Sequence, residues 1–223
     1  MRCIDKIING KPIQYITNEQ EFMKLKFYVD ENVLIPQPDT EIIVEKIIDE
    51  FKDKEVKILD LCTGSGAIAI SLAKYIKRSK IFATDISNKA IQIAKLNAEK
   101  NLVHKKIDFI LSDMFKNIEK DTFDIIVSNP PYIKTKDIAN LEKSVQNEPN
   151  IALDGGEDGL KFYKIIAENA YKFLNNNGKL YLEIGFDQKK DVINLLEKNN
   201  KYKEITCIKD LACNDRLVIA SKV

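Results

Sequence analysis

The hydrophobic pattern of the chain changes near Val56. From there to the end, short apolar runs alternate with longer segments in which apolar residues recur at helical spacing. The runs are β-branched and short, which predicts strands buried on both faces. The expected strands are residues 56–61, 80–85, 107–111, 123–127 and 179–184, followed by a closing hairpin of 202–208 and 216–220. Strands alternating with helices are typical of an α/β fold with a parallel sheet.

Helices are expected between these strands, where the apolar residues form one stripe. Their predicted bounds are 67–76, 88–101, 159–174 and 189–199. No internal repeat or linker interrupts the series, and we therefore expect a single structural domain.

The first fifty residues follow a different pattern. Residues 24–29 alternate polar and apolar, which predicts a small β-hairpin or an edge strand. Pro38-Asp39-Thr40 is typical of a helix start, and an apolar stripe continues to Phe51. The residues before Gly10 indicate a helix tail or a loose arm. We interpret 1–51 as a hairpin and helix lid segment beside a main domain at 52–223.

Composition narrows the classes of function. The chain has 223 residues, 35 Lys and Arg against 34 Asp and Glu, and a net charge of +1, which gives no general attraction to nucleic acid or membranes. It shows no signal peptide and no membrane-spanning run, and its four cysteines form no Cys-x-x-Cys pair, so a cytoplasmic location is expected. The single histidine, His104, argues against a histidine triad or a metal site, and we expect no metal.

A glycine-containing loop, Asp60–Gly66, joins the first strand of the main domain to its helix. Gly64 and Gly66 let the backbone approach a ligand, and the helix amino terminus directs amide hydrogens at it. The spacing Gly64-x-Gly66-x-x-Ala69 also fits nicotinamide dinucleotide enzymes. The loop alone does not separate those enzymes from enzymes that use S-adenosylmethionine (SAM).

Acidic residues follow the next two strands. Asp85 ends the second strand, where a carboxylate accepts both ribose hydroxyls of a nucleotide, although a helix N-cap is the alternative. Asp113 and Met114 follow the third strand, where Asp113 can accept from an adenine amine and Met114 can pack on the ring. A plain turn is the alternative there.

The segment Ser128-Asn129-Pro130-Pro131-Tyr132 follows the buried strand 123–127. The two prolines fix φ and lack amide hydrogens, so they form a stiff corner at the strand end where open α/β sheets bind ligands. Asn129 Oδ1 and the Pro130 carbonyl can each accept one N–H of a planar NH2 group, and the Tyr132 ring can pack on its face. A strand-ending turn is the alternative. Because no His or Tyr-Lys constellation for hydride transfer is present, the corner favours methyl transfer from SAM to nitrogen.

Taken together, these residues resemble the HemK/PrmC family, the N5-glutamine methyltransferases of peptide-chain release factors. Asn-Pro-Pro-Tyr also occurs in enzymes that methylate amino groups of DNA and RNA, whereas Pro38–Glu41 and the Gly-Gly-x-Asp-Gly run before Leu160 narrow the match. The similar segments are Glu21-Phe22, 35–41, 63–68, 128–132, Glu148-Pro149, 153–160, 182–185 and 214–216.

The resemblance implies a Rossmann-like class I SAM-dependent methyltransferase, with a seven-stranded, mostly parallel sheet whose last strand is antiparallel. It also implies a release factor as protein partner, and we expect a monomer. The cofactor-binding residues that it implies are Cys62, Thr63, Gly64, Ser65, Gly66, Asp85, Ile86, Asp113, Met114 and Asn129. Those that would hold the glutamine of the release factor's Gly-Gly-Gln loop are Asn129, Pro130, Pro131 and Tyr132, with Asn129, Pro130 and Tyr132 as the catalytic residues.

Four features depart from the family pattern. Gln37 replaces a usual Arg, Met114 replaces a commoner aromatic residue, and Cys62 replaces a usual Gly. A cysteine at that position needs φ below zero or accepts strain. The chain also starts where the helical amino-terminal domain of family members would be ending.

Three other functions stay open at this stage. The first is an amino methyltransferase for nucleic-acid bases, which a basic groove beside Tyr132 would support. The second is a SAM-binding module without activity, and the third is glutamine methylation of a ribosomal protein. Glu183, at the end of the fifth strand, either lines the pocket or caps a helix.

Overall fold

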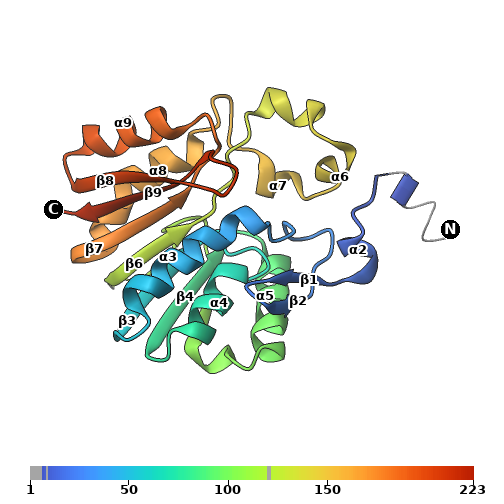
Figure 1. Cartoon of the computed structure of the whole chain (residues 1–223), viewed down its shortest axis with the longest axis horizontal. Helices are drawn as coiled ribbons and strands as arrows, with labels where there is room; N and C mark the ends of the chain where they lie inside the picture. Colours follow the sequence, from blue (N-terminus) through green and yellow to red (C-terminus); the bar gives the residue numbers. More distant parts are fainter. Residues whose placement is uncertain (1–6, 9, 120–121) are drawn as a thin grey trace.

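The apolar runs form a seven-stranded sheet in the computed structural model, which describes residues 7–8, 10–119 and 122–223 (Figure 1). The spatial order is β5-β4-β3-β6-β7-β9-β8. Neighbours from β5 to β7 are parallel, whereas β9, the last strand of the chain, runs antiparallel between β7 and β8. The predicted fold class is therefore confirmed. The strands are β3 (Val56–Leu61), β4 (Ser79–Asp85), β5 (Ile107–Leu111), β6 (Phe123–Ser128), β7 (Leu174–Glu183), β8 (Tyr202–Lys209) and β9 (Asp215–Lys222).

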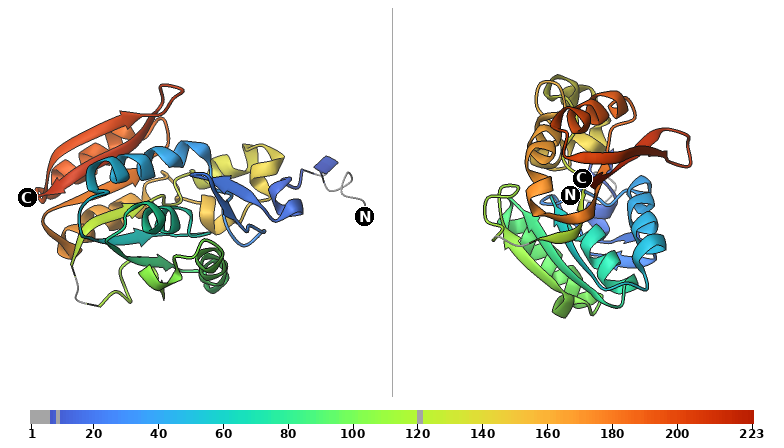
Figure 2. Two further views of the ribbon diagram at one scale, coloured as in Figure 1. Left: turned by 60° about the horizontal axis from the view of Figure 1, so that its bottom comes forward. Right: turned by 90° about the vertical axis from the view of Figure 1, so that its left-hand side faces the viewer.

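Helices cover both faces of the sheet, as two further views show (Figure 2). Ile58 of β3 packs in the hydrophobic cluster that contains residues of α3, α4 and α5, and the adjacent Leu59 packs in the cluster of α8 and α9. Successive side chains of this strand thus pack against the helices on opposite faces of the sheet, because successive Cβ atoms point to opposite faces. The helices are α3 (Glu41–Phe51), α4 (Ala67–Tyr75), α5 (Asn88–Lys100), α8 (Lys161–Phe173) and α9 (Lys189–Asn199).

Two boundaries differ from the sequence prediction. Helix α8 begins at Lys161, later than predicted, because Gly159 has a φ of 72°, which a helix cannot contain. Strand β7 begins at Leu174, where 179 was expected, and pairs Leu174 with Phe123 before a register shift. The sequence did not predict the first residues of this strand, because the polar run 175–177 has neither alternating nor continuous apolar residues.

Short elements precede the sheet and connect its later parts. β1 and β2 form the expected antiparallel hairpin, with Met23 and Lys24 at positive φ in its turn. The expectation for residues before Gly10 lies mostly outside the described residues. The short elements are α2 (Gln14–Thr17), β1 (Gln20–Phe22), β2 (Leu25–Phe27), η1 (Pro38–Thr40), η2 (His104–Lys106), η3 (Thr135–Asn140), α6 (Lys143–Gln146) and α7 (Asn150–Leu153).

The strand order reverses between β3 and β6. The chain runs outward from β3 through β4 to β5 and then returns to place β6 on the other side of β3. The carboxyl ends of these four parallel strands meet at one edge, where the diverging connections leave a crevice. The fold therefore brings together the loop after β3, Asp85, Asp113 and the Asn-Pro-Pro-Tyr corner.

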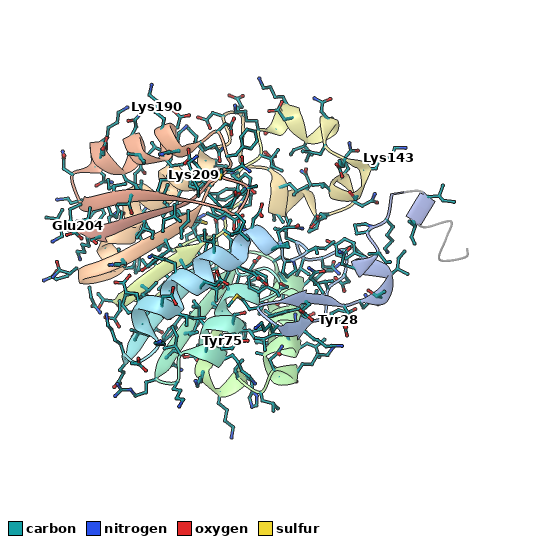
Figure 3. All side chains as sticks on the ribbon, in the orientation of Figure 1. Tyr28, Tyr75, Lys143, Lys190, Glu204 and Lys209 are labelled. Atoms are coloured by element: carbon teal, nitrogen blue, oxygen red, sulfur yellow. The ribbon has the colours of Figure 1, made fainter. Side chains whose placement is uncertain are left out.

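Asn97, on α5, ties the amino-terminal segment to the sheet. Its side chain has no exposed surface, and its Oδ1 accepts a hydrogen bond from Tyr28 N at 2.7 Å. Its Nδ2 donates to Tyr28 O and to Ser65 O, each at 2.9 Å. Tyr75 on α4 adds a hydrogen bond from its hydroxyl to Met23 O at 2.6 Å (Tyr28 and Tyr75 are labelled in Figure 3). One buried amide thus links the hairpin to the loop that follows β3.

Other features of the described residues limit the kinds of site. Within them, no helix is long and apolar enough to cross a bilayer, and no group of His, Cys, Asp or Glu has the geometry of a metal site. Cys62, Cys207 and Cys213 are free thiols, and Cys3 lies outside the described residues.

Replacing Asn97 by Ala is expected to lower the free energy of unfolding by about 3 kcal/mol, because the buried Ser65 carbonyl and the partly buried N–H and carbonyl of Tyr28 lose their partner. Asn101, the C-cap of α5, also bonds the hairpin, through Nδ2 to Lys26 O at 3.0 Å, but it is partly exposed. Asn101→Ala is therefore the matched control, with an expected loss below about 1 kcal/mol. Denaturant unfolding measures both, and equal losses would contradict the role given to Asn97.

Candidate active site

A cavity of about 330 Å³ lies at the carboxyl ends of the parallel strands. Its lining combines the loop after β3, the ends of β4 and β5, and the corner after β6. The sequence-predicted residues that line it are Cys62, Gly64, Asp85, Ile86, Asp113, Met114, Asn129 and Pro131. Those that do not line it are Thr63, Ser65, Gly66, Pro130 and Tyr132.

Asp60, at the end of β3, holds the loop in shape from below. Its Oδ2 accepts hydrogen bonds from Thr63 Oγ1 at 2.7 Å and from Ala69 N at 3.2 Å. The carboxyl group is fully buried, and desolvation raises its pKa to about 7. Gly66 has a φ of 84°, and a Cβ there would lie 2.8 Å from Ile70 Cδ1. Thr63 and Gly66 therefore shape the loop, whereas Gly64 and Cys62 face the cavity.

Two of the departures from the family pattern meet in the structure. Cys62 has a φ of 61°, so the residue adopts the strained left-handed conformation that a glycine would take freely. Its Sγ lies 3.8 Å from Sδ of Met114, which itself has a φ of 50°. Burial, with Asp85 and Asp60 nearby, raises the pKa of the Cys62 thiol. The cavity wall here is therefore formed by two neutral sulfur side chains.

Asp85 holds the cavity side of the loop. Its Oδ2 accepts from Gly64 N and its Oδ1 from Ser87 N, both at 2.9 Å. The N-cap of α5 is Ser87, whose side chain accepts from Ala90 N, so the alternative reading of Asp85 as the cap is wrong. Burial raises the pKa of Asp85, against these backbone donors. Each carboxylate oxygen retains a lone pair that can accept a ligand hydroxyl.

The corner after β6 presents two free acceptors. Ser128 donates from Oγ to Leu61 O at 2.8 Å, which joins the corner to β3. Asn129 donates from Nδ2 to Thr40 Oγ1 at 3.2 Å, so its Oδ1 is left for a ligand. Among the described residues, none donates a hydrogen bond to the Pro130 carbonyl. This is the acceptor pair that the sequence predicted.

The glycine-rich run after α7 supports the corner from behind. Ile133 N donates to Leu153 O at 2.9 Å, and Gly155 N donates to Ile133 O at 2.8 Å. A Cβ on Gly155 would lie 2.7 Å from Tyr132 Cα, so only glycine permits this approach. Gln188, at the start of α9, donates from Nε2 to Tyr132 O at 3.0 Å. The backbone of the glycine-rich run and the side-chain amide of Gln188 thus fix the corner.

Glu183 lies behind Asn129 and does not line the cavity. Its side chain is 3% exposed, and its neighbours are the Thr40 and Asn129 side chains and the Arg216 guanidinium. Desolvation raises its pKa to about 7. The ring of Tyr132 lies in the same surroundings, close to Glu183 and Arg216. Neither reading of Glu183 from the sequence describes this position.

Apolar side chains from distant segments complete the cavity, and the sequence analysis did not name them. They come from the loop before η1, from α7 and from α8, none of which ends a parallel strand. No spacing rule connects these segments to the cofactor loop, and only their apolar character would have been a signal. They are Val33, Leu34, Ile151, Ala152, Phe162 and Ile165.

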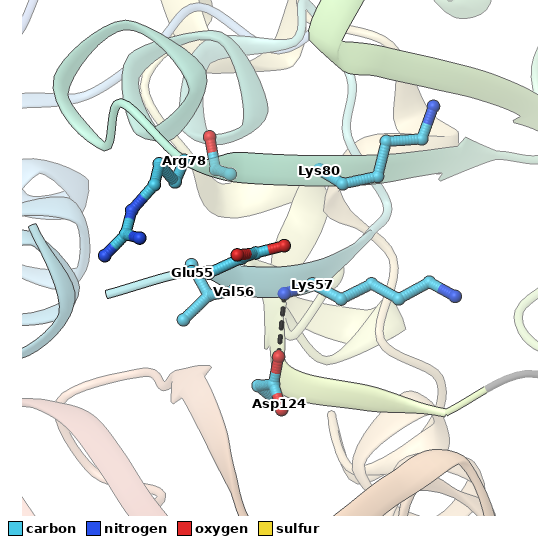
Figure 4. A pocket seen from close by; sticks show the side chains of 7 residues that line it. Glu55, Val56, Lys57, Arg78, Lys80 and Asp124 are labelled. Atoms are coloured by element: carbon cyan, nitrogen blue, oxygen red, sulfur yellow. Dashed lines mark hydrogen bonds between the residues drawn. The ribbon is translucent and has the colours of Figure 1, made fainter. Parts of the chain in front are cut away.

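A larger groove, of about 590 Å³, lies at the opposite end of the sheet (Figure 4). The groove is lined by charged and polar side chains, with Val56 as the apolar residue among the lining residues described. It lies where strands β3, β4 and β6 begin, away from the loop after β3 and the corner after β6, and it lacks the apolar wall of the cavity. The cavity at the carboxyl ends is therefore the candidate active site.

Comparison with known proteins agrees with this geometry. The sequence model of the family described as "Methyltransferase small domain" matches residues 37–157, which span the cofactor loop and the corner. A protein of Thermodesulfovibrio yellowstonii named release factor glutamine methyltransferase is 42% identical over 98% of this chain and 79% of its own length. The chain belongs to the family of release factor glutamine methyltransferases. The resemblance found from the motifs is thus confirmed, and the chain is a methyltransferase.

Other members and solved structures extend the comparison. Relatives of the same name from Clostridium acetobutylicum and Flavobacterium psychrophilum are 44% and 46% identical, over 94% and 93% of this chain and 74% of each relative. A methyltransferase structure from Pyrococcus furiosus has a TM-score of 0.67 at 21% identity, covering 98% of this chain and 97% of that chain. The hMettl16 catalytic domain has a TM-score of 0.70 at 16% identity, covering 96% of this chain and 82% of that one. These two likenesses show the fold.

Replacing Gly155 by Ala tests the support of the corner. The φ of Gly155 is outside the left-handed region, so an alanine there is strained by its contacts with the Tyr132 backbone and with the Gly159 carbonyl oxygen, which its Cβ would approach to 3.0 Å. We expect the free energy of unfolding to fall by about 1–3 kcal/mol, the usual cost of overpacking. Where space is available the same substitution stabilises a protein by about 0.4–1 kcal/mol, so a rise in stability would contradict the contact.

Proposed function

We propose that this chain transfers a methyl group from SAM to the N5 atom of a protein glutamine, and that its substrate is the Gly-Gly-Gln glutamine of peptide-chain release factors. The observation that carries the proposal is the pair of unpartnered acceptors, Asn129 Oδ1 and the Pro130 carbonyl: Asn129 lines a cavity suited to a nucleoside, and Pro130 lies between the two lining residues Asn129 and Pro131. The names of the relatives support the choice of substrate. Such a function is carried out in the cytoplasm, where translation terminates.

The cavity fits SAM in the chemistry of its lining. Asp85 supplies a carboxylate for ribose hydroxyls, and Asp113 and Met114 supply an acceptor and a flat apolar contact for adenine. Phe162 and Ile165 add an apolar wall. When bound, SAM supplies an electrophilic methyl group on a sulfonium. One oxygen of Asp113 is already paired with Lys116 Nζ at 2.6 Å, and the other is left for the amine.

The corner would align the nucleophile. An amide nitrogen is a weak nucleophile, because its lone pair is delocalised into the carbonyl group. By accepting a hydrogen bond from each N–H group, Asn129 Oδ1 and the Pro130 carbonyl would orient this nitrogen toward the methyl group. They would also stabilise the positive charge that develops on the nitrogen. The two acceptors are preorganised, because the backbone of Gly155 and the side-chain amide of Gln188 fix the corner before any substrate arrives.

The main alternative, methylation of a nucleic-acid base, is not favoured. It would be supported by a basic groove beside Tyr132. Two acids and one base, Glu183, Asp39 and Arg216, act on Tyr132, and the charged residues that line the cavity are Asp85, Asp113 and Lys161, so the described lining has no cluster of basic groups. A protein glutamine needs no such groove, because its amide is neutral.

Mass spectrometry of a purified release factor, incubated with this chain and SAM, tests the function. We expect one added methyl group on the glutamine of the Gly-Gly-Gln peptide, and none on a release factor in which that glutamine is replaced. Ribosomal protein and transfer RNA incubated in parallel separate the alternatives. Methylation of either, with the release factor unmodified, would overturn the proposal.

Replacing Asn129 by Ala removes one of the two acceptors. The rate of turnover is expected to fall by about 10²–10³-fold, by analogy with the loss of one oxyanion-hole donor in acyl transfer. SAM affinity, measured by calorimetry, is expected to stay close to that of the wild type, because the other cavity residues remain. Unchanged turnover would remove Asn129 from the mechanism.

A further inference from the structure

Three side chains from three separate elements meet behind the corner: Thr40 from η1, Asn129 after β6, and Glu183 from the end of β7. Asn129 Nδ2 donates to Thr40 Oγ1 at 3.2 Å. Desolvation has the larger effect on the pKa of the Glu183 carboxyl, but the side chains of Thr40 and Asn129 also lie close enough to lower this pKa by hydrogen bonding. Thr40 and Glu183 are buried, with 4% and 3% of their surfaces exposed. Nothing in the methyl-transfer scheme above uses Thr40 or Glu183.

The hydrogens in this cluster have one consistent arrangement when Glu183 is ionised. A carboxylate only accepts, so the Thr40 hydroxyl donates its hydrogen to Glu183. The oxygen of that hydroxyl then accepts from Asn129 Nδ2. With its Nδ2 directed at two acceptors, the amide of Asn129 must turn its Oδ1 toward the cavity.

A neutral Glu183 reverses the preference. A protonated carboxyl carries an O–H donor, which can bond the amide oxygen of Asn129. The flipped amide would then present Nδ2 to the cavity. There it would face the N–H donors of a substrate NH2 group, and two donors form no hydrogen bond.

We propose that Glu183 is a positioning residue whose carboxylate, acting through Thr40, fixes the amide orientation of Asn129 so that Oδ1 faces the substrate. The proposal rests on the proposed function only for its effect on turnover. The orientation of Asn129 is a property of the free protein and is measured without any substrate.

The surroundings of Glu183 place its titration near neutral pH, where the protein can be studied in its folded state. Desolvation is the largest influence and raises its pKa to about 7, while Oε2 has no hydrogen-bond partner among the described residues. Arg216 opposes this rise, but it is shared with Asp39 at 3.2 Å and Asp210 at 3.1 Å. The titratable and charged groups that face the cluster are Arg216, Asp39, Asp210, Tyr132 and Tyr163.

The sign of the pH effect follows. Below about pH 7 Glu183 gains a proton, and the productive orientation of Asn129 is lost. Turnover is therefore expected to rise with pH through this value. Glu148 offers a matched control, because its buried carboxyl also has a pKa raised to about 7 by desolvation, yet it accepts from Ile35 N at 2.8 Å and has no contact with Asn129 among those described.

The first test follows the side-chain amide resonances of Asn129 by NMR in the free protein, between pH 5.5 and 8.5 (a range of about 1.5 units on either side of the expected midpoint). We expect a titration with its midpoint near 7 in the wild type, its loss in Glu183→Gln, and its retention in Glu148→Gln. Resonances that titrate unchanged in Glu183→Gln, or that do not titrate in the wild type, would overturn the proposal.

The second test is kinetic and uses methyl transfer to the release factor. Thr40→Val removes the hydroxyl with little change of shape and is expected to lower kcat about tenfold, the value of one hydrogen bond to a charged group. Thr40→Ser keeps the hydroxyl and should restore kcat, and KM for SAM should be the same in all three proteins. Glu183→Gln should lower kcat and flatten the acid limb of its pH profile. Equal activity of the Val and Ser variants would overturn the relay, whereas a wild type that leaves the release factor unmethylated would overturn the proposed function and leave the NMR test in force.

Discussion

The contact between the backbones of Gly155 and Tyr132 is the constraint on which the geometry of the candidate active site depends. A proline pair fixes the local backbone angles, but it does not fix the orientation of the segment relative to the rest of the protein. Here the glycine-rich run lies against the far side of the corner, and Gln188 bonds the Tyr132 carbonyl. Because these partners are backbone atoms and a buried amide, the Pro130 carbonyl stays free of structural hydrogen bonds. The corner is rigid and still has acceptors to offer.

The other side of the cavity, formed by the loop after β3, is held by two carboxylates. Asp60, which is fully buried, accepts from the Thr63 hydroxyl of the loop and from Ala69 N of α4, and the partly buried Asp85 accepts from Gly64 N of the loop. Desolvation raises the pKa of both, and their backbone donors partly offset this cost. Because the Gly64 amide is held by Asp85, the loop needs no side-chain packing at Gly64 to keep its shape. No atom lies within 4 Å of the Cβ position of Gly64. Asn97 then couples this loop to the amino-terminal hairpin.

The sequence predicted most of the strands and several of the residues that line the cavity, for physical reasons. Buried parallel strands are short apolar runs, so β3 to β6 were found within a residue of their observed ends. Parallel strands bring their carboxyl ends to one edge, so Asp85, Asp113 and Asn129 were expected to meet, and they do. The start of β7 was missed, because its first residues are polar. The position of Glu183 was also missed, because its neighbours come from η1 and β9, and no local pattern relates those segments. The roles of the cavity residues, and the division of the chain at residue 51, stay predictions.

The sulfur contact in the cavity wall has a consequence for chemical compatibility. A thiolate is among the best acceptors for an alkyl group, so a cysteine beside an alkylating cofactor invites self-modification. Cys62 lines the cavity, but burial between Asp60 and Asp85 holds its thiol in the protonated form, which is a far weaker nucleophile. In the proposed function, burial and the two acidic neighbours would therefore also protect the thiol from methylation. A cysteine in place of the usual glycine would be compatible with the proposed cofactor because burial, reinforced by Asp85 and Asp60, keeps its thiol neutral.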